Sequence, residues 1–342
     1  MKRIYLIKMH LLFKDENSFS STMENNYVDQ FKYTQHVIMI GPIRDDMAIF
    51  IISHCPCLIS IDIGDYMQPF PKFTDHTLQS IAEHCTGLQS LSLSWCRGIT
   101  DSGLIAISEH CPNLKSLEFY NCHQITDASI ISISTHCTGL KLLNLGCLQI
   151  TDASIISISI HCTGLQSLNL ADCDQITDAS IISISSHCTG LQLLKIGGCD
   201  QITDVSIISI STHCTGLQSL HLNRCHQISD TGIIPISENC TGLKRLYVRF
   251  TDITDVSLIA IAKNCTGLQL LDTFGCNGLS SSTLHDEFKS ISELRAVLLS
   301  IYPSLPICLV YIKLYNSLNT IHSKNNDIHV VLSKLECSIF NR

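Results

Sequence analysis

Cysteine is the chemically reactive residue with the most regular spacing in this chain of 342 residues. Sixteen of the 19 cysteines form two ladders with steps of about 26 residues. The first ladder consists of Cys55, Cys85, Cys111, Cys137, Cys162, Cys188, Cys214, Cys240 and Cys265. The second ladder, in which Phe250 fills one gap, consists of Cys96, Cys122, Cys147, Cys173, Cys199, Cys225 and Cys276. Thiolates at a fixed spacing can bind a metal ion or act as redox groups, because stacked strands bring equivalent residues to roughly 5 Å.

The residues around these cysteines favour a structural role over metal or redox chemistry. The sequence contains no C-x-x-C pair, and His-Cys dipeptides occur only in the first ladder. A reactive thiolate needs exposure and a cationic setting, whereas a buried cysteine packs as a small hydrophobic side chain. The length of the chain and the regular spacing also differ from those of short secreted disulfide scaffolds. We therefore predict reduced structural thiols, with no metal and no cofactor.

Histidines and aspartates repeat with the same period. The histidines directly precede cysteines of the first ladder: His84, His110, His136, His161, His187 and His213. The aspartates follow a threonine or serine: Asp75, Asp101, Asp127, Asp152, Asp178, Asp204, Asp230 and Asp255. We interpret both sets as helix-end residues, because carboxylates suit the positive helix start and histidines the negative end. One carboxylate per unit cannot supply the six to eight oxygens that calcium requires. With no nucleophile–base pair, phosphate loop or H-E-x-x-H motif, the sequence predicts no enzyme.

A single unit, residues 162–187, shows which elements hold these residues. The alternation of Leu165, Leu168 and Leu170 predicts a short strand with one buried face. Thr177 or Asp178 can then accept hydrogen bonds from the free N–H groups of the first turn of a helix. The buried helix face is predicted from residues at i, i+3, i+4 and i+7: Ile181, Ile184, Ser185 and Cys188. Each unit is therefore predicted to be strand, turn, helix, turn.

Burial inside one unit cannot offset the cost of ordering about 26 residues, so the units must stack. We predict an α/β fold, a right-handed leucine-rich-repeat solenoid shaped as a horseshoe. A parallel sheet would line the concave face, and helices would cover the convex face. One set of isoleucines, about 100° from the centre of the buried helix face, is predicted to form a seam between neighbouring helices. This set comprises Ile131, Ile156, Ile182, Ile208 and Ile234.

The repeated pattern L-x-x-L-x-L-x-x-C-x-x-I-T-D, with a further cysteine at the helix end, resembles the cysteine-containing leucine-rich repeat. That repeat occurs in F-box/LRR substrate receptors of SCF-type ubiquitin ligases and in antagonist-of-mitotic-exit proteins. The resemblance covers roughly residues 45–282, with nine cysteine-started units. It implies a horseshoe that holds a protein partner on its concave face and rim, and it implies no chemistry.

Three regions follow from the pattern. Residues 1–44 form a predicted N-terminal cap with no recognisable F-box, because they contain no Leu-Pro start, no tryptophan and no clear helical period. Within this cap, residues 33–40 are predicted to be an edge strand that seals the first unit. Residues 45–282 form the repeat array. Residues 283–342 form a C-terminal cap and tail, with a predicted helix over 284–299 and a capping strand over 307–314.

Composition limits the location and the partners. The formal charge of −8 argues against a nucleic-acid binder, which needs a basic stripe. No apolar run reaches the ~18 residues of a membrane span, and Lys8 and His10 interrupt the apolar N-terminus where a signal peptide would be continuous. We therefore predict a cytoplasmic or nuclear protein that binds neither nucleic acid nor membrane. The N-C-T sequons at Asn239 and Asn264 would matter only after secretion.

The outward strand positions vary while the framework repeats, so we predict that they bind the partner. Aromatic and charged side chains supply the candidates: Trp95, Glu118, Tyr120, Lys195, His221, Arg224, Arg245, Tyr247, Arg249, Asp272 and Phe274. The five cationic or potentially cationic candidates all lie in the C-terminal half of this face. Our hypothesis is that they bind an acidic or phosphorylated segment, since arginine grips such groups with two hydrogen bonds. The alternative is a solvated face of mixed charge.

Two main functions remain open. The family resemblance favours a substrate-recognition component of an SCF-type ubiquitin ligase, acting in ubiquitin-dependent protein catabolism and contacting an adaptor or cullin. The missing F-box favours a free-standing scaffold that sequesters or inhibits its partner without a ligase. A secreted recognition receptor is a third alternative, which glycosylation at Asn239 or Asn264 would indicate. The sequence names neither the partner nor the oligomeric state.

Overall fold

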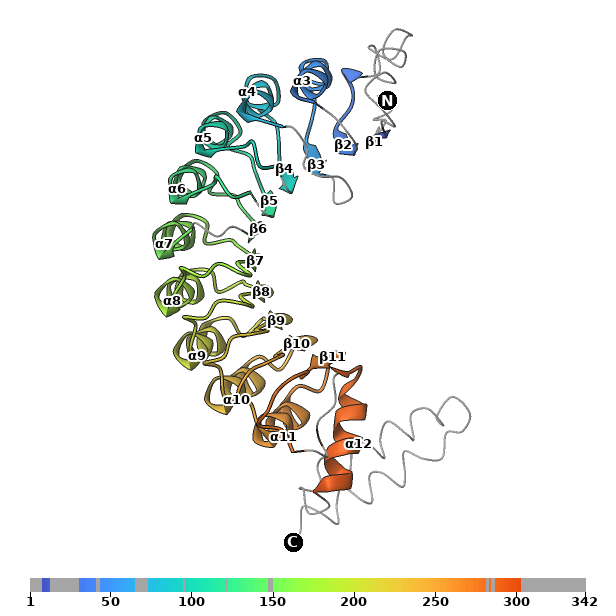
Figure 1. Cartoon of the computed structure of the whole chain (residues 1–342), viewed down its shortest axis with the longest axis vertical. Helices are drawn as coiled ribbons and strands as arrows, with labels where there is room; N and C mark the ends of the chain where they lie inside the picture. The colour runs from blue at the N-terminus through green and yellow to red at the C-terminus, as the bar shows by residue number, and fades with distance from the viewer. Residues whose placement is uncertain are drawn as a thin grey trace, which may run out of the picture.

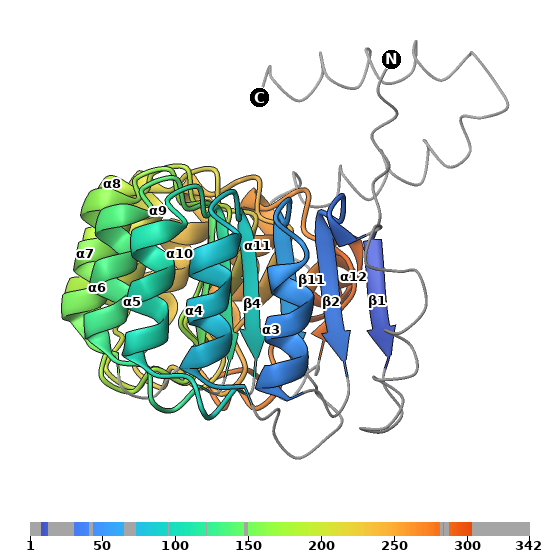
Figure 2. The same cartoon turned by 90° about the horizontal axis from the view of Figure 1, so that it is seen from above.

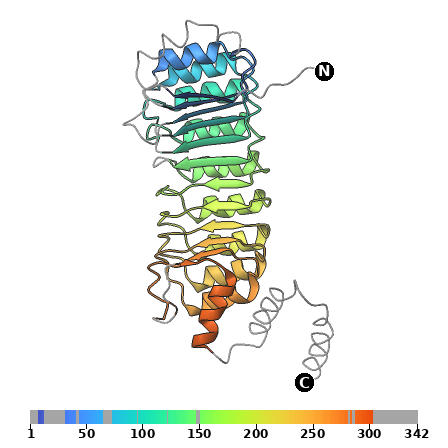
Figure 3. The same cartoon turned by 90° about the vertical axis from the view of Figure 1, so that its right-hand side faces the viewer.

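The computed structural model describes residues 8–12, 31–40, 44–64, 73–94, 96–120, 122–146, 150–280, 283 and 287–302. In this part of the chain the units stack into an open, curved solenoid with strands inside and helices outside (Figure 1). Seen from above, the helices form one layer and the sheet the other (Figure 2), and the strands lie one above the next across the inner face (Figure 3). The predicted leucine-rich-repeat solenoid is confirmed.

The strands form one continuous sheet in chain order. They are β1 (Lys8–Leu12), β2 (His36–Ile40), β3 (Ser60–Gly64), β4 (Ser90–Ser94), β5 (Ser116–Tyr120), β6 (Leu142–Gly146), β7 (Ser167–Asn169), β8 (Leu193–Lys195), β9 (Ser219–His221), β10 (Arg245–Tyr247), β11 (Leu270–Asp272) and β12 (Glu287–Phe288). Neighbouring strands from β1 to β11 pair in parallel, and only β12 is antiparallel to its neighbour β11. The buried Leu168 of β7 lies in register with Leu143 and Leu194, so equivalent leucines stack through the core.

The helices cover the outer side of the sheet. They are α3 (Asp45–Ser53), α4 (Asp75–His84), α5 (Asp101–His110), α6 (Asp127–His136), α7 (Asp152–His161), α8 (Asp178–His187), α9 (Asp204–His213), α10 (Asp230–Asn239), α11 (Asp255–Asn264) and α12 (Ile291–Ile301). In α8, the Thr177 side chain accepts a hydrogen bond from the Ala179 N–H at 3.2 Å, which caps the first turn. The helix buries Ser180, Ile181, Ile184 and Ser185. The predicted buried face is therefore confirmed.

The repeated aspartates lie in the first turn of each helix, as predicted, but their carboxylates accept hydrogen bonds from the next unit and do not cap their own helix. Thr203 donates from its backbone N–H to Oδ1 of Asp178 at 2.9 Å, and from its hydroxyl to Oδ2 at 2.5 Å. The same pair of bonds joins Asp101 to Thr126 of the following unit. The threonine caps its own helix, and the aspartate binds the start of the next unit. The sequence pattern predicts caps within each unit, because it does not show that Asp178 and Thr203, 25 residues apart, are neighbours.

The described cysteines are free thiols, and all but Cys57 are buried. In the first ladder from Cys85 onward, each thiol donates to the carbonyl of an earlier unit, as when Cys188 donates to the Cys162 carbonyl at 3.5 Å. In the second ladder Cys199 donates to the Leu170 carbonyl at 3.2 Å. Burial raises the pKa of Cys188 to about 11, which keeps the thiol protonated. These contacts agree with the expected structural role.

The gap in the second ladder is filled by Thr251 and not by Phe250, contrary to the sequence prediction. Thr251 is buried, donates to the Val248 carbonyl at 2.7 Å and lies 3.6 Å from the sulfur of Cys276. Phe250 is 38% exposed and has a φ of 56°. Arg224 and Gly275, at the equivalent position of the neighbouring units, also have positive φ. The threonine is polar, so hydrophobicity alone placed the register one residue too early.

The ends of the array differ from the sequence prediction in two respects. The strand predicted over 33–40 exists as β2, but β1 pairs outside it, so β2 is not the edge strand. The C-terminal helix begins at Ile291 and not at 284, because β12 turns back against β11 first. The strand predicted over 307–314 lies outside the described residues.

The isoleucine seam between the helices is only partly sealed. Ile156, Ile182 and Ile234 are half-buried, whereas Ile131 of α6 and Ile208 of α9 are each 37% exposed. The predicted seam therefore holds at three of its five positions and opens at the other two. The buried core itself runs without a break from β2 to α12.

Candidate partner-binding site on the concave face

The pleat of the strands turns every second side chain toward the concave face, as the half-buried and buried positions of β6 alternate. Glu118 of β5 is half-buried and lies in register between Ser92 and Asn144. Two other candidates from this end, Trp95 and the side chain of Tyr120, lie outside the described residues. The described part of the candidate site is therefore concentrated in the C-terminal half, from β8 to β11.

Three candidates form a row across the sheet. Lys195, His221 and Tyr247 are register partners on β8, β9 and β10. The rings of His221 and Tyr247 stack with centroids 4.1 Å apart and an angle of 22°. Burial, followed by the charges of Lys195 and Arg245, lowers the pKa of His221 to about 4. The imidazole is therefore neutral at pH 7, and His221 contributes an aromatic surface and not a charge.

A second group surrounds Arg249. Its Nε lies 2.5 Å from Oδ2 of Asp272, which is only 2% exposed. The guanidinium carbon lies 5.7 Å from the ring centre of Phe274, and that ring meets Phe250 edge-on at 5.4 Å. Asp272 is thus a buried anchor for Arg249 and not an exposed contact residue. The aromatic side chains hold the outer part of the guanidinium at the surface.

Arg224 and Arg245 are exposed, and neither forms an ion pair among the described residues. Arg245 begins β10, next to Ser219 of β9 in the register. Arg224 has a positive φ of 63° in the loop that follows β9. Positive φ is uncommon for a residue with a side chain, and Arg224 shares it with the equivalent residues Asp172 and Phe250 of the neighbouring units.

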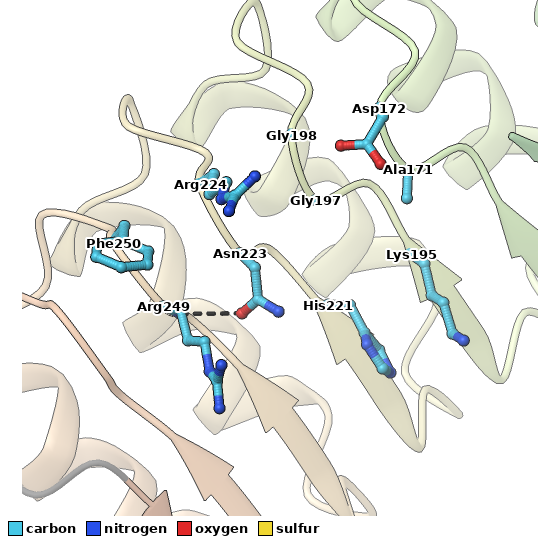
Figure 4. A pocket seen from close by; sticks show the side chains of 10 residues that line it. All are labelled: Ala171, Asp172, Lys195, Gly197, Gly198, His221, Asn223, Arg224, Arg249 and Phe250. Carbon is cyan, nitrogen blue, oxygen red and sulfur yellow. Dashed lines mark hydrogen bonds between the residues drawn. The ribbon is translucent and has the colours of Figure 1, made fainter. Parts of the chain in front are cut away.

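A pocket of about 280 Å³ opens where β7 to β10 end (Figure 4). It brings together three of the predicted cationic candidates, Lys195, Arg224 and Arg249, with the neutral ring of His221. The other lining residues were not predicted as candidates: Ala171, Asp172, Gly197, Gly198, Asn223 and Phe250. The signal that could have found the pocket is the Gly-Gly pair, which stands where neighbouring units have Ala-Asp and Asn-Arg.

The chemistry available here is recognition by charge, hydrogen bonding and aromatic contact. Among the described residues, no three histidine, cysteine, aspartate or glutamate side chains gather as a metal site requires. None of the described helices has the length and the apolar character needed to cross a membrane.

Comparison with known proteins identifies the fold. A family model described as Leucine Rich repeat matches residues 84–108, 161–185, 213–237 and 239–262. A search of curated proteins found no match. Among solved structures, the complex of Rad7 and Elc1 in yeast matches with a TM-score of 0.63 and 22% identity over 74% of this chain. An internalin (inlF) from Listeria monocytogenes matches with a TM-score of 0.51 and 20% identity over 73% of this chain.

The matched regions span 66% and 64% of those two solved chains, which is less than two thirds of each. At these identities the likeness shows the fold alone. The four matched repeats, the parallel sheet with outer helices and the two buried cysteine ladders agree with one another. The chain therefore has the leucine-rich-repeat fold, and it carries two ladders of cysteines.

Proposed function

We propose that this chain is a non-catalytic protein-binding scaffold whose C-terminal concave face, β8 to β11, holds an acidic or phosphorylated segment of its partner. The observation that carries the proposal is the gathering of Lys195, Arg224, Arg245 and Arg249 beside the neutral His221–Tyr247 stack. Arginine and tyrosine are among the side chains that dominate interface energies. In a protein with a formal charge of −8, this local excess of cations would also steer an acidic partner to this face.

We further propose that the scaffold is the substrate-recognition component of an SCF-type ubiquitin ligase in the cytoplasm or nucleus. Two observations support this assignment. The repeat resembles that of F-box/LRR receptors, and one similar solved structure is a complex with a second protein, Elc1. The second candidate is a free-standing sequestering scaffold. The absence of an F-box pattern in residues 1–44 favours that candidate.

The docking face is tested by affinity purification with the full chain, followed by quantitative mass spectrometry. The test variant is Arg245→Glu with Arg249→Glu, and the control is Lys244→Glu with Lys263→Glu, whose exposed lysines lie outside the pocket. Both variants change the net charge equally. We expect the first to reduce capture of the partner about tenfold or more and the control to leave it within about twofold. Equal capture by wild type and the test variant would exclude this face.

The same purification separates the two candidate functions. Co-purification of an adaptor and a cullin, lost on deletion of a short N- or C-terminal segment but not on substitution of the concave face, would support the ligase component. A partner recovered without adaptor or cullin would support the sequestering scaffold and end the ligase proposal.

A further inference from the structure

The pocket at the ends of β7 to β10 lies at a break in the repeat. The residue before each second-ladder position has positive φ in five consecutive units: Asp172, Gly198, Arg224, Phe250 and Gly275. Each positive-φ residue and the residue before it form a dipeptide, and four of the ten residues in these five dipeptides are polar or charged. The dipeptide at 197–198 consists only of glycine. A Cβ atom on Gly197 would lie 3.0 Å from the backbone oxygen of Asn223. The two glycines therefore leave backbone as the floor of the pocket.

The backbone N–H of the residue before each positive-φ position has a hydrogen-bond acceptor in some units and not in others. In three units this N–H is satisfied by a side chain from the concave face. Ala171 donates to Oδ1 of Asn169 at 3.1 Å, Arg249 to Oδ1 of Asn223 at 3.0 Å, and Phe274 to Oδ1 of Asp272 at 3.4 Å. The equivalent N–H groups of Gly197 and Asn223 make no hydrogen bond within the described part of the chain.

The reason lies two residues earlier in each of these units. The position of Asn169 and Asp272 is taken by Lys195 before Gly197 and by His221 before Asn223. Lysine has no acceptor atom, and Nε2 of His221 is engaged with the Ser219 hydroxyl at 3.1 Å. In these two adjacent units the side chain two residues earlier accepts no hydrogen bond from the N–H group, and both units line the same pocket. Backbone donors left open in this way are the kind that bind anions.

Three cationic side chains line the same space. Lys195 and Arg224 form no ion pair among the described residues, and Arg249 is held in place by the buried Asp272. Figure 4 shows Arg224 and Arg249 on one side of Asn223 and Lys195 on the other. Asp172 is the one lining carboxylate, and it lies beside Gly198 at the rim. The lining therefore carries more positive than negative charge and more donors than acceptors.

We propose that this pocket is a binding site for the phosphate of a phosphorylated serine or threonine in the partner segment. A phosphate offers three acceptor oxygens and nearly two negative charges, which matches two N–H groups and three cations better than a carboxylate does. The volume of about 280 Å³ is below that of sites that enclose a whole small molecule, and it suits a single modified side chain. This proposal rests on the proposed function, because it names what the concave face recognises.

The test is an amide titration of the full chain by ¹⁵N–¹H NMR at low salt. The probe is N-acetyl-phosphoserine methylamide, and the comparison probe is N-acetyl-glutamate methylamide. We expect saturable shifts of the Gly197 and Asn223 amides with the phosphoserine probe, at an affinity about tenfold or more above that of the glutamate probe. Equal response to both probes, or no response to either, overturns the phosphate assignment.

Two variants make the result specific to the geometry. Lys195→Asn removes one cation and introduces the acceptor that Asn169 already provides in the neighbouring unit, so the fold accepts it. It should lower the affinity for the phosphoserine probe about tenfold or more. Lys244→Asn makes the same change at an exposed position outside the pocket and should leave the affinity within about twofold. Equal affinity in both variants would mark an adventitious ion only and would overturn the proposal.

The two proposals fail separately. If the amides of Gly197 and Asn223 do not respond, yet Arg245→Glu with Arg249→Glu still abolishes partner capture, the phosphate site is wrong and the docking face stands. If the amides respond but partner capture is unaffected, the phosphate site stands and the docking function is wrong.

Discussion

The convex layer and the concave wall of the same solenoid follow opposite rules. From α6 to α9 the helices are nearly identical, and the same contact recurs between neighbours, with hydroxyl pairs Ser134–Ser157, Ser159–Ser183 and Ser185–Ser209 each at 2.6 Å. Across the wall from β7 to β11, one register position holds a different side chain in each strand: Asn169, Lys195, His221, Tyr247 and Asp272. Repetition on one side fixes the backbone, so the other side can vary without loss of fold.

This contrast predicts where a substitution is felt. A change in the repeated layer removes contacts within its own unit and between units, so it lowers the free energy of unfolding. A change on the wall alters what the surface presents, and it costs little stability unless the side chain supports another, as Asp272 supports Arg249. The following experiments test that division, beginning with the largest expected effect.

Ile184→Ala should destabilise the protein by about 2–5 kcal/mol, because Ile184 is fully buried in the middle of the array and truncation leaves a cavity. The matched control is Ile160→Ala on the neighbouring helix, since Ile160 is 52% exposed; it should cost less than about 0.5 kcal/mol. Denaturant unfolding followed by circular dichroism measures both. Equal losses would mean that the convex surface is as tightly coupled as the core.

Asp230→Ala should cost about 1–3 kcal/mol at neutral pH, because the carboxylate accepts hydrogen bonds from the N–H and hydroxyl of Thr254 in the next unit. Burial raises the pKa of Asp230, but hydrogen bonds from Ser257 and Thr254 outweigh it and hold the pKa below its usual value. The unfolded chain therefore binds more protons near pH 4, and stability falls as the pH drops through the folded pKa.

Unfolding free energies measured between pH 7 and pH 3 check this linkage. The wild type should lose stability across that range, and Asp230→Ala should lose less of it. Asp252→Ala, at an exposed position nearby, is the control and should follow the wild type within about 0.5 kcal/mol. A variant with the full acid dependence of the wild type would show that this bond between units contributes nothing to it.

The repeated layer could be predicted from the sequence because each of its positions occurs in up to nine units. Period, polarity and spacing then average over many copies, and Ile181, Ile184 and the cysteines fall where expected. The bonds between units were less visible, since Asp178 and Thr203 are 25 residues apart and each has a plausible local role. The outer strand β1 has no repeat to reveal it.

The wall could be predicted only as a set of outward positions. That Arg249 pairs with Asp272, or that His221 stacks on Tyr247, depends on contacts between single side chains of different units, which no repetition reveals. The sequence also assigned Phe250 instead of Thr251 to the second ladder, because one polar residue at a buried position breaks the hydrophobic pattern. The pocket exists because Gly197 and Gly198 have no side chains, and a prediction based on aromatic and charged side chains does not consider glycines.

The smallest expected effect concerns the charge of His221. Its pKa of about 4 lies below the usual 6.5, so between these values the unfolded chain takes up a proton that the folded chain does not, and folding weakens as the pH falls. NMR titration of the ring should give a midpoint near pH 4, and Tyr247→Ala should raise it because the ring loses its stacked cover. A wild-type midpoint at 6.5 or above would make His221 a cation near neutral pH. Anion binding by the concave wall would then depend on pH, and His221 would contribute a charge as well as an aromatic surface.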